Sequence, residues 1–114
     1  DHARLMAAKA FAVRHGVVLV LKGAYTAIFA PDGRIFFNAT GNPGMAKGGS
    51  GDALTGIITG IRAQGSDPVS SALLGVHSHG SAGDLAANEL GMDGMLVSEL
   101  IDHLPQALKK LRNV

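Results

Sequence analysis

Apolar positions in the first third of the chain predict one helix and three short strands. Across residues 2–15 they recur at helical spacing and share one face: Leu5, Ala8, Phe11 and Ala12. Residues 17–21 form an unbroken apolar run, which is typical of a strand buried on both faces in a parallel sheet. Residues 25–30 and 34–37 flank the turn Pro31-Asp32-Gly33, so they predict a hairpin at an antiparallel edge of that sheet.

The rest of the chain predicts helices. Residues 50–64 have helical apolar spacing. Asp67 is expected to cap a long helix that has Pro68 at its first position. Ser98 is expected to cap a last helix, which Pro105 kinks or splits. Strands followed by helices indicate an α/β fold, and no linker or low-complexity tract divides the chain into two domains.

The composition excludes several classes of function. With 10 Lys and Arg against 9 Asp and Glu the net charge is +1, and the chain has one Tyr and four Phe, so nothing indicates a nucleic-acid surface. No apolar run reaches membrane-spanning length and nothing resembles a secretory signal, so we expect no membrane partner. The absence of Cys excludes disulfides and thiolate metal sites, and it agrees with a cytoplasmic location. We expect a homo-oligomer.

The clearest chemistry lies in the segment Gly41-Asn42-Pro43-Gly44-Met45-Ala46-Lys47-Gly48-Gly49-Ser50-Gly51-Asp52. Its glycines lead straight into a helix start, where backbone N–H groups converge and the helix dipole adds positive charge. Such a place suits a phosphate group. An acid on the same turn is a poor phosphate ligand because like charges repel. Asp52 is therefore better explained as a base beside a transferring phosphoryl group.

Three other residues attract attention. Lys22 follows the strand at residues 17–21, and α/β sheets place ligand sites at strand ends. The alternative for Lys22 is a solvated surface lysine before a turn glycine. His77 and His79 are two apart on a predicted helix and so point to different faces, whereas a metal pair prefers a spacing of four. We expect these histidines to pack near the glycine loop and to bind no metal.

The glycine segment closely resembles the signature of the ADP- or ATP-dependent NAD(P)H-hydrate dehydratases, which belong to the ribokinase-like superfamily. Leu21-Lys22-Gly23-Ala24-Tyr25-Thr26 resembles the family's nucleotide segment, and residues 75–84 resemble the helix that follows. The resemblance implies that residues 1–114 are the C-terminal part of a ribokinase-like sandwich. We expect a mostly parallel sheet with a β-hairpin edge and flanking helices. The N-terminal part of the domain is expected to lie outside this sequence.

The resemblance also implies a role for each residue of these segments. Asp52 is the catalytic base and faces the substrate, hydrated NADH or NADPH, with Asn42 as a further candidate on that side. The backbone of Gly49, Ser50 and Gly51 forms an anion hole. ADP or ATP, with Mg²⁺, contacts Gly51 and the strand-end segment: Lys22, Gly23, Ala24, Tyr25 and Thr26. The ring hydroxyl is phosphorylated and then leaves as phosphate, which restores the ring double bond.

Two other functions remain open. A small-molecule kinase of the same superfamily, acting on a sugar or a thiamin precursor, would use Asp52 in the same way but keep the phosphorylated product. The second alternative is a nucleotide-binding or assembly fragment that carries out no catalysis. Recovery of reduced nicotinamide absorbance separates the dehydratase from both.

Overall fold

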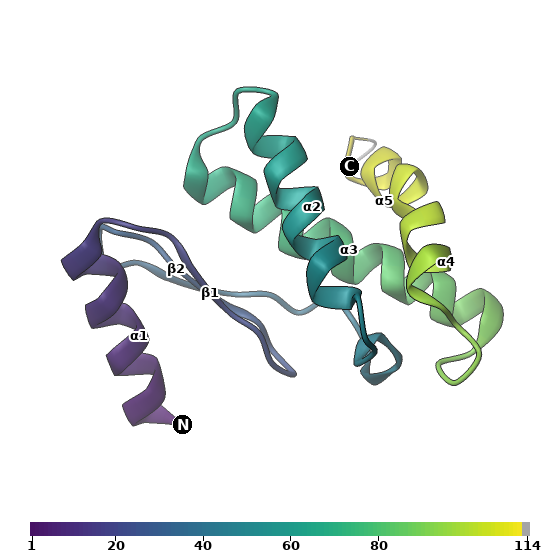
Figure 1. Ribbon diagram of the computed structural model, residues 1–114, viewed down its shortest axis with the longest axis horizontal. Helices are drawn as coiled ribbons and strands as arrows, with labels where there is room; N and C mark the ends of the chain where they lie inside the picture. The colour runs from purple at the N-terminus through teal and green to yellow at the C-terminus, as the bar shows by residue number, and fades with distance from the viewer. Residues whose placement is uncertain (113–114) are drawn as a thin grey trace.

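The computed structural model describes residues 1–112. Its elements in chain order are α1 (His2–His15), β1 (Leu19–Leu21), β2 (Ala27–Phe29), β3 (Ile35–Phe37), the 3-10 helix η1 (Pro43–Met45), α2 (Ser50–Ala63), α3 (Pro68–Leu90), α4 (Val97–Asp102) and α5 (Leu104–Arg112). Figure 1 shows α1 and the strands at one end of the molecule and α2 to α5 at the other. The longest helix, α3, contacts α2 along its first part and α4 and α5 along its second.

The three strands form one sheet in the order β1-β2-β3, and both pairs are antiparallel. The predicted hairpin of β2 and β3 is confirmed, with Phe29 opposite Ile35. The predicted mostly parallel sheet is wrong for the described residues, because β1 also runs antiparallel to β2, with Leu19 opposite Phe29. The reason is the length of the connection. Residues 22–26 join β1 to β2, whereas parallel neighbours need a crossover of about a dozen residues or more.

Helices cover both faces of this small sheet. On one face Ala27 and Phe29 pack with Ala8 and Ala12 of α1. On the other, Ile28 packs with residues of α2 and α3: Leu54, Ala72 and Val76. The apolar run at residues 17–21 also packs on both faces: Leu19 and Leu21 join the first cluster, and Val18 and Val20 join the second. Packing on both faces, rather than a parallel neighbour, explains this run, although β1 itself is only half-buried.

The helix starts follow the sequence closely. Asp67 caps α3 by accepting a hydrogen bond from the backbone N–H of Ser70 at 2.9 Å, and Pro68 is the first helical residue. α2 begins after Gly49, whose φ of 92° is in the left-handed region that favours glycine. The two helices pack closely because Gly75 has no side chain; a Cβ there would lie 3.3 Å from the Cα of Ile58.

The last helices correct one prediction. α4 begins at Val97, with Leu96 at the cap position, rather than after a cap at Ser98. The Glu99 carboxylate accepts from the backbone N–H of Leu96 at 3.0 Å. α4 ends at Asp102 with His103 as its C-cap, and α5 begins at Leu104, next to Pro105, which confirms the predicted split. A third core cluster holds α4 and α5 against α3: Ala82, Ala86, Met95, Leu100 and Ala107. Within residues 1–112, no helix combines the length and apolar character needed to cross a membrane.

Phe29→Ala should lower the free energy of unfolding by about 3–5 kcal/mol, because this fully buried ring is lost between α1 and the sheet. The matched control is Phe37→Ala on β3, whose side chain is 61% exposed and should cost about 0.5 kcal/mol or less. Urea denaturation measures both values. Equal losses for the two variants would contradict this description of the core.

Candidate functional site

A cavity of about 700 Å³ lies where the end of β1, the glycine loop and the middle of α3 meet. Three segments far apart in the sequence line it, and they lie within residues 22–26, 38–54 and 76–80. Its lining residues are Lys22, Gly23, Ala24, Thr26, Asn38, Thr40, Gly41, Asn42, Pro43, Met45, Ala46, Lys47, Ser50, Gly51, Leu54, Val76, His79 and Gly80. The fold therefore brings the strand-end segment and the glycine loop to one place.

Lys22 and Gly51 are in direct contact at this cavity. A Cβ on Gly51 would lie 2.5 Å from the Nζ of Lys22, so a larger residue here would move the flexible Lys22 side chain away from its present position. Gly51 lies in the first turn of α2, where N–H groups have no intrahelical acceptor. Among residues 1–112, the N–H groups of Gly51 and Asp52 donate to no protein acceptor; on either side of them, Ser50 donates to the carbonyl of Lys47 at 3.2 Å and Ala53 to that of Gly49 at 3.0 Å. A lysine charge and free helix N–H groups together favour an anion.

Ser50 connects this helix start to α3. Its Oγ lies 3.3 Å from the Nε2 of His79, and both residues are more than nine-tenths buried. Burial lowers the pKa of His79; the hydrogen bond with Ser50 opposes that shift, and the charge of Lys22 adds to it. His79 is therefore a neutral imidazole near pH 7, and it fixes the position of the Ser50 hydroxyl at the cavity wall.

The carboxylate of Asp84, one helical turn beyond Gly80, holds the start of the glycine loop. It accepts from the backbone N–H of Gly41 at 3.0 Å and from the Nδ2 of Asn42 at 2.9 Å. Asn42 in turn accepts from the N–H of Gly44 at 3.0 Å through its Oδ1. Both polar atoms of Asn42 are thus used to shape the loop.

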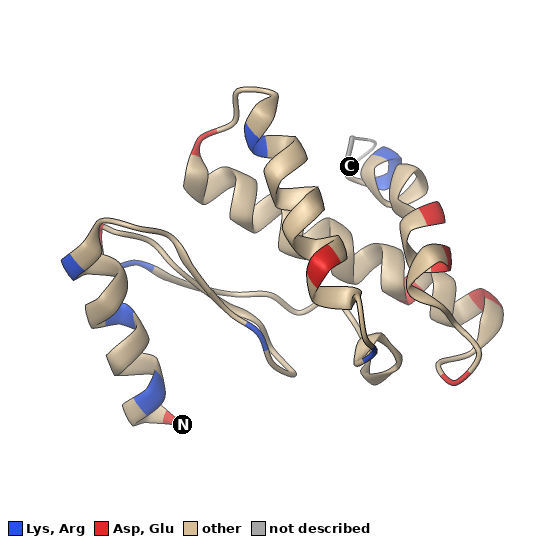
Figure 2. Ribbon diagram, viewed as in Figure 1, with Lys and Arg blue, Asp and Glu red and all other residues tan. Residues whose placement is uncertain are grey.

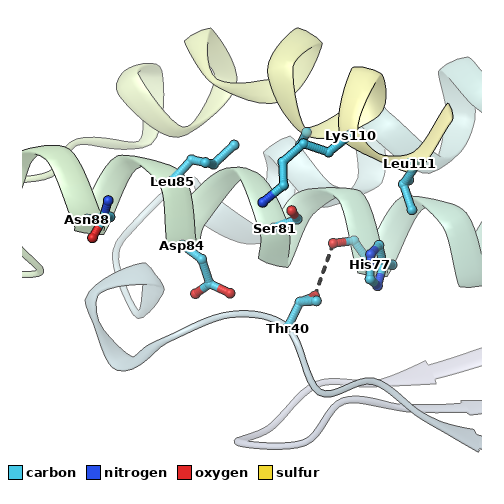
Figure 3. Close-up of a pocket in the computed structure, with 9 residues that line it drawn as sticks. Thr40, His77, Ser81, Asp84, Leu85, Asn88, Lys110 and Leu111 are labelled. Atoms are coloured by element: carbon cyan, nitrogen blue, oxygen red, sulfur yellow. Dashed lines mark hydrogen bonds between the residues drawn. The ribbon is translucent and has the colours of Figure 1, made fainter. Parts of the chain in front are cut away.

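A second cavity, of about 600 Å³, lies between α3 and α5 (Figure 3). Its residues are Thr40, His77, Ser81, Asp84, Leu85, Asn88, Ala107, Lys110 and Leu111. The hydroxyl of Thr40 donates to the carbonyl of His77 at 3.0 Å, and Thr40 lines both cavities. This cavity contains none of the residues of the glycine loop after Thr40, so we do not place the phosphate chemistry there. His77 and His79 face different cavities, as their spacing predicted.

The predicted site residues fall into two groups. Most of them line the first cavity: Lys22, Gly23, Ala24, Thr26, Asn42, Ser50 and Gly51. Three do not: Gly49, which caps α2; Tyr25, which is 70% exposed; and Asp52, which is exposed on the first turn of α2. Asp52 is the one acidic residue of α2 and lies in its first turn, and Figure 2 shows the red of an acidic residue at that end of the helix. His79 was not predicted to line the cavity. The neighbouring glycine, Gly80, could have indicated it, because its missing Cβ lets α3 contact Thr40.

Comparison with known proteins agrees with this arrangement. The sequence profile of the NAD(P)H-hydrate dehydratase family matches residues 1–106. The chain belongs to this family. It is 50% identical over 108 residues to the bifunctional NAD(P)H-hydrate repair enzyme Nnr of Moorella thermoacetica, a match that covers 95% of this chain and 20% of that protein. It is 42% identical over 103 residues to the ADP-dependent (S)-NAD(P)H-hydrate dehydratase of Bacillus subtilis, covering 90% of this chain and 37% of that enzyme.

Solved structures give the same picture. The ADP/ATP-dependent NAD(P)H-hydrate dehydratase of B. subtilis, co-crystallised with ATP and Mg²⁺, superposes with a TM-score of 0.87 at 41% identity, over 94% of this chain and 39% of that one. A ribokinase-like superfamily protein from Enterococcus faecalis superposes with a TM-score of 0.76 at 34% identity, over 93% of this chain and 36% of that one. The described residues are thus part of a ribokinase-like fold. The chain spans between about a fifth and two fifths of these relatives.

Lowering the pH should destabilise the protein through His79. Its folded-state pKa is below the usual value of about 6.5, so the unfolded chain takes up the proton first, and the free energy of unfolding falls as the pH drops below that value. His79→Gln keeps a hydrogen-bonding group for Ser50 but cannot titrate, so its stability should fall less over the same range. The pKa of His103 is shifted upward, but His103 is present in both proteins and cancels in the difference. Identical pH dependences of urea unfolding would contradict this.

Proposed function

We propose that the protein carrying this chain dehydrates hydrated NADH or NADPH at the expense of an adenine nucleotide. The supporting observation is the Lys22 ammonium against Gly51, at a helix start with unpaired N–H groups and with Asp52 one residue further on. The B. subtilis relatives named as ADP- or ATP-dependent dehydratases support the choice of reaction. A cytoplasmic location and a homo-oligomeric assembly are part of the same proposal.

The reaction needs a base and an anion site. Asp52 accepts the proton of the hydroxyl on the hydrated nicotinamide ring. The hydroxyl oxygen then bonds to the terminal phosphorus of the nucleotide, and the bond from that phosphorus to the bridging oxygen breaks. The C–O bond of the phosphorylated ring breaks next, and its electron pair leaves with the phosphate. The neighbouring ring carbon then gives a proton to solvent, and its C–H electron pair restores the ring double bond. Hydroxide is a poor leaving group and phosphate a good one, which is why a nucleotide is consumed.

The chain's own residues supply binding and orientation. The N–H groups of Gly49 and Gly51 are the donors of the anion hole for the transferring phosphoryl group, whereas the N–H of Ser50, also expected there, already donates to the carbonyl of Lys47 at 3.2 Å. The segment from Lys22 to Thr26 contacts the nucleotide, with Gly51 on its other side, and Asn42 shapes the loop on the substrate side. Mg²⁺ neutralises charge on the phosphates when it is bound. Its ligands are expected to be mainly phosphate oxygens, since residues 1–112 contain no cluster of three acidic, His or Cys side chains.

The chain covers 37% of the B. subtilis dehydratase. The nucleotide side of the site lies within these residues, and we expect the rest of the substrate pocket to come from the remainder of the domain. Residues 1–114 alone should therefore show little or no turnover. The runner-up function, a kinase of the same superfamily, would leave a stable phosphorylated product and restore no reduced nicotinamide absorbance.

Lys22→Met should raise the KM for ADP or ATP far more than the KM for hydrated cofactor. The substitution keeps the aliphatic stem and removes the charge beside Gly51. Steady-state kinetics of the complete protein, with each substrate varied in turn, measures both constants. Lys109→Met on α5, which removes an exposed lysine outside both cavities, is the matched control. The reverse pattern would move Lys22 to the substrate side.

Asp52→Asn should lower kcat about 10²–10⁴-fold, the usual contribution of a positioned base. The amide keeps the size of the side chain, so the α2 start should be preserved, and nucleotide binding should hold steady or tighten because a negative charge near phosphate is lost. Turnover of the complete protein and calorimetric titration with ADP give the two readouts. The control is Asp102→Asn, an exposed acid on α4. Near-normal turnover of the Asp52→Asn variant would remove Asp52 from the reaction.

A further inference from the structure

The side chain of Lys47 leaves the glycine loop and ends among backbone carbonyl groups. Its Nζ donates to the carbonyl oxygen of Met92 at 3.1 Å, to that of Asp93 at 3.5 Å, and to that of Met95 at closer range. These three residues lie in the turn between α3 and α4. Lys47 belongs to the glycine loop by sequence, and no step of the proposed reaction uses it.

The surroundings of the Lys47 ammonium resemble those of a bound cation. An ammonium group has three donors, and here three carbonyl oxygens receive them. Within residues 1–112 neither recorded ion pair includes Lys47, so neutral carbonyl dipoles balance its charge. Rings of backbone carbonyls replace the hydration shell of singly charged ions such as potassium. Divalent ions instead prefer sites with carboxylate ligands. The ligand set therefore fits a monovalent cation of about the size of ammonium.

The Lys47 ammonium lies where the glycine loop contacts the turn between α3 and α4. Gly44, in the same loop, touches the same turn: a Cβ on Gly44 would lie 2.8 Å from the carbonyl oxygen of Met92. The carbonyl of Lys47 also accepts from the N–H of Ser50, the first residue of α2, at 3.2 Å. The ammonium thus joins the turn after α3 to the residue that orients the start of α2.

We propose that the Lys47 ammonium is an internal cation that occupies a monovalent-cation site formed by the carbonyls of Met92, Asp93 and Met95. It acts as a positioning residue, because it fixes the glycine loop against the turn without reaching the phosphate. Shortening the side chain to alanine leaves the three carbonyls around a space in which free ammonium or potassium binds. Methionine at the same position fills most of that space with an uncharged chain, so it blocks the replacement.

The test compares Lys47→Ala and Lys47→Met in the complete protein, in tetramethylammonium, ammonium and potassium chloride at equal ionic strength. In tetramethylammonium both variants should melt several degrees below the parent protein, because three carbonyls have lost their donor. Ammonium and potassium should restore the melting temperature of Lys47→Ala but not that of Lys47→Met. The parent protein and Lys109→Ala, which loses an exposed lysine elsewhere, should respond equally to all three salts. A Lys47→Ala protein that folds only when ammonium or potassium is present would support the proposal equally.

A second readout reports on the loop itself. The Kd of Lys47→Ala for ADP should rise about tenfold in tetramethylammonium and return toward the parent value in ammonium chloride. This readout rests on the proposed function, whereas the melting temperature does not; a parent protein that fails to bind ADP would remove the proposed function and leave the cation test intact. A Lys47→Ala protein as stable as the parent in tetramethylammonium would overturn the proposal. So would a destabilised one that neither ammonium nor potassium restores.

Discussion

The attachment of the glycine loop to α3 is the constraint on which the candidate site depends. A loop with many glycines has high conformational entropy in the unfolded chain, so its converging N–H groups must be held by contacts from outside. The Asp84 carboxylate provides two of these, to Gly41 and Asn42. The bond from Thr40 to the carbonyl of His77 and the contact of Ser50 with His79 provide two more. For the proposed function, these contacts mean that the donors of the anion site do not have to be ordered at the moment of binding.

The same helix is shaped to accept the loop. Two glycines of α3 lie where the loop crosses it. Gly80 lies against Thr40, and Gly83 lies against the side chain of Met45. A larger residue at either position would displace the loop from the helix and lengthen the hydrogen bonds that fix it. The glycines of α3 therefore allow the glycine loop to approach the helix, in addition to allowing α2 to pack against it.

Sequence alone predicted the parts of this molecule that local rules determine. Apolar spacing, the glycine loop before residue 50 and the cap at Asp67 located α2 and α3. The rule that ligand sites lie at strand ends singled out Lys22, which lines the same cavity as the glycine loop. The predicted direction of β1 was wrong, because its apolar run was taken as typical of a parallel sheet. The short connection at residues 22–26 already indicated an antiparallel pair with β2. The contacts of Asp84 and Lys47 were out of reach, since each joins groups more than 40 residues apart and no local pattern marks the partner.

The cavity and the core share a boundary. Leu54 and Val76 line the cavity and also pack with Ile28 in the cluster that joins the sheet to α2 and α3. Lys22 comes from the sheet, whereas Gly51 comes from the helices, so their contact exists only while that cluster holds the two layers together. A substitution at Leu54 or Val76 would change stability and ligand binding together. The side chains of Asp84, His79 and Lys47 are not members of the three apolar clusters, although Lys47 donates to the backbone carbonyl of Met95, which is one. These are the positions where the geometry of the loop can be altered while the core remains intact.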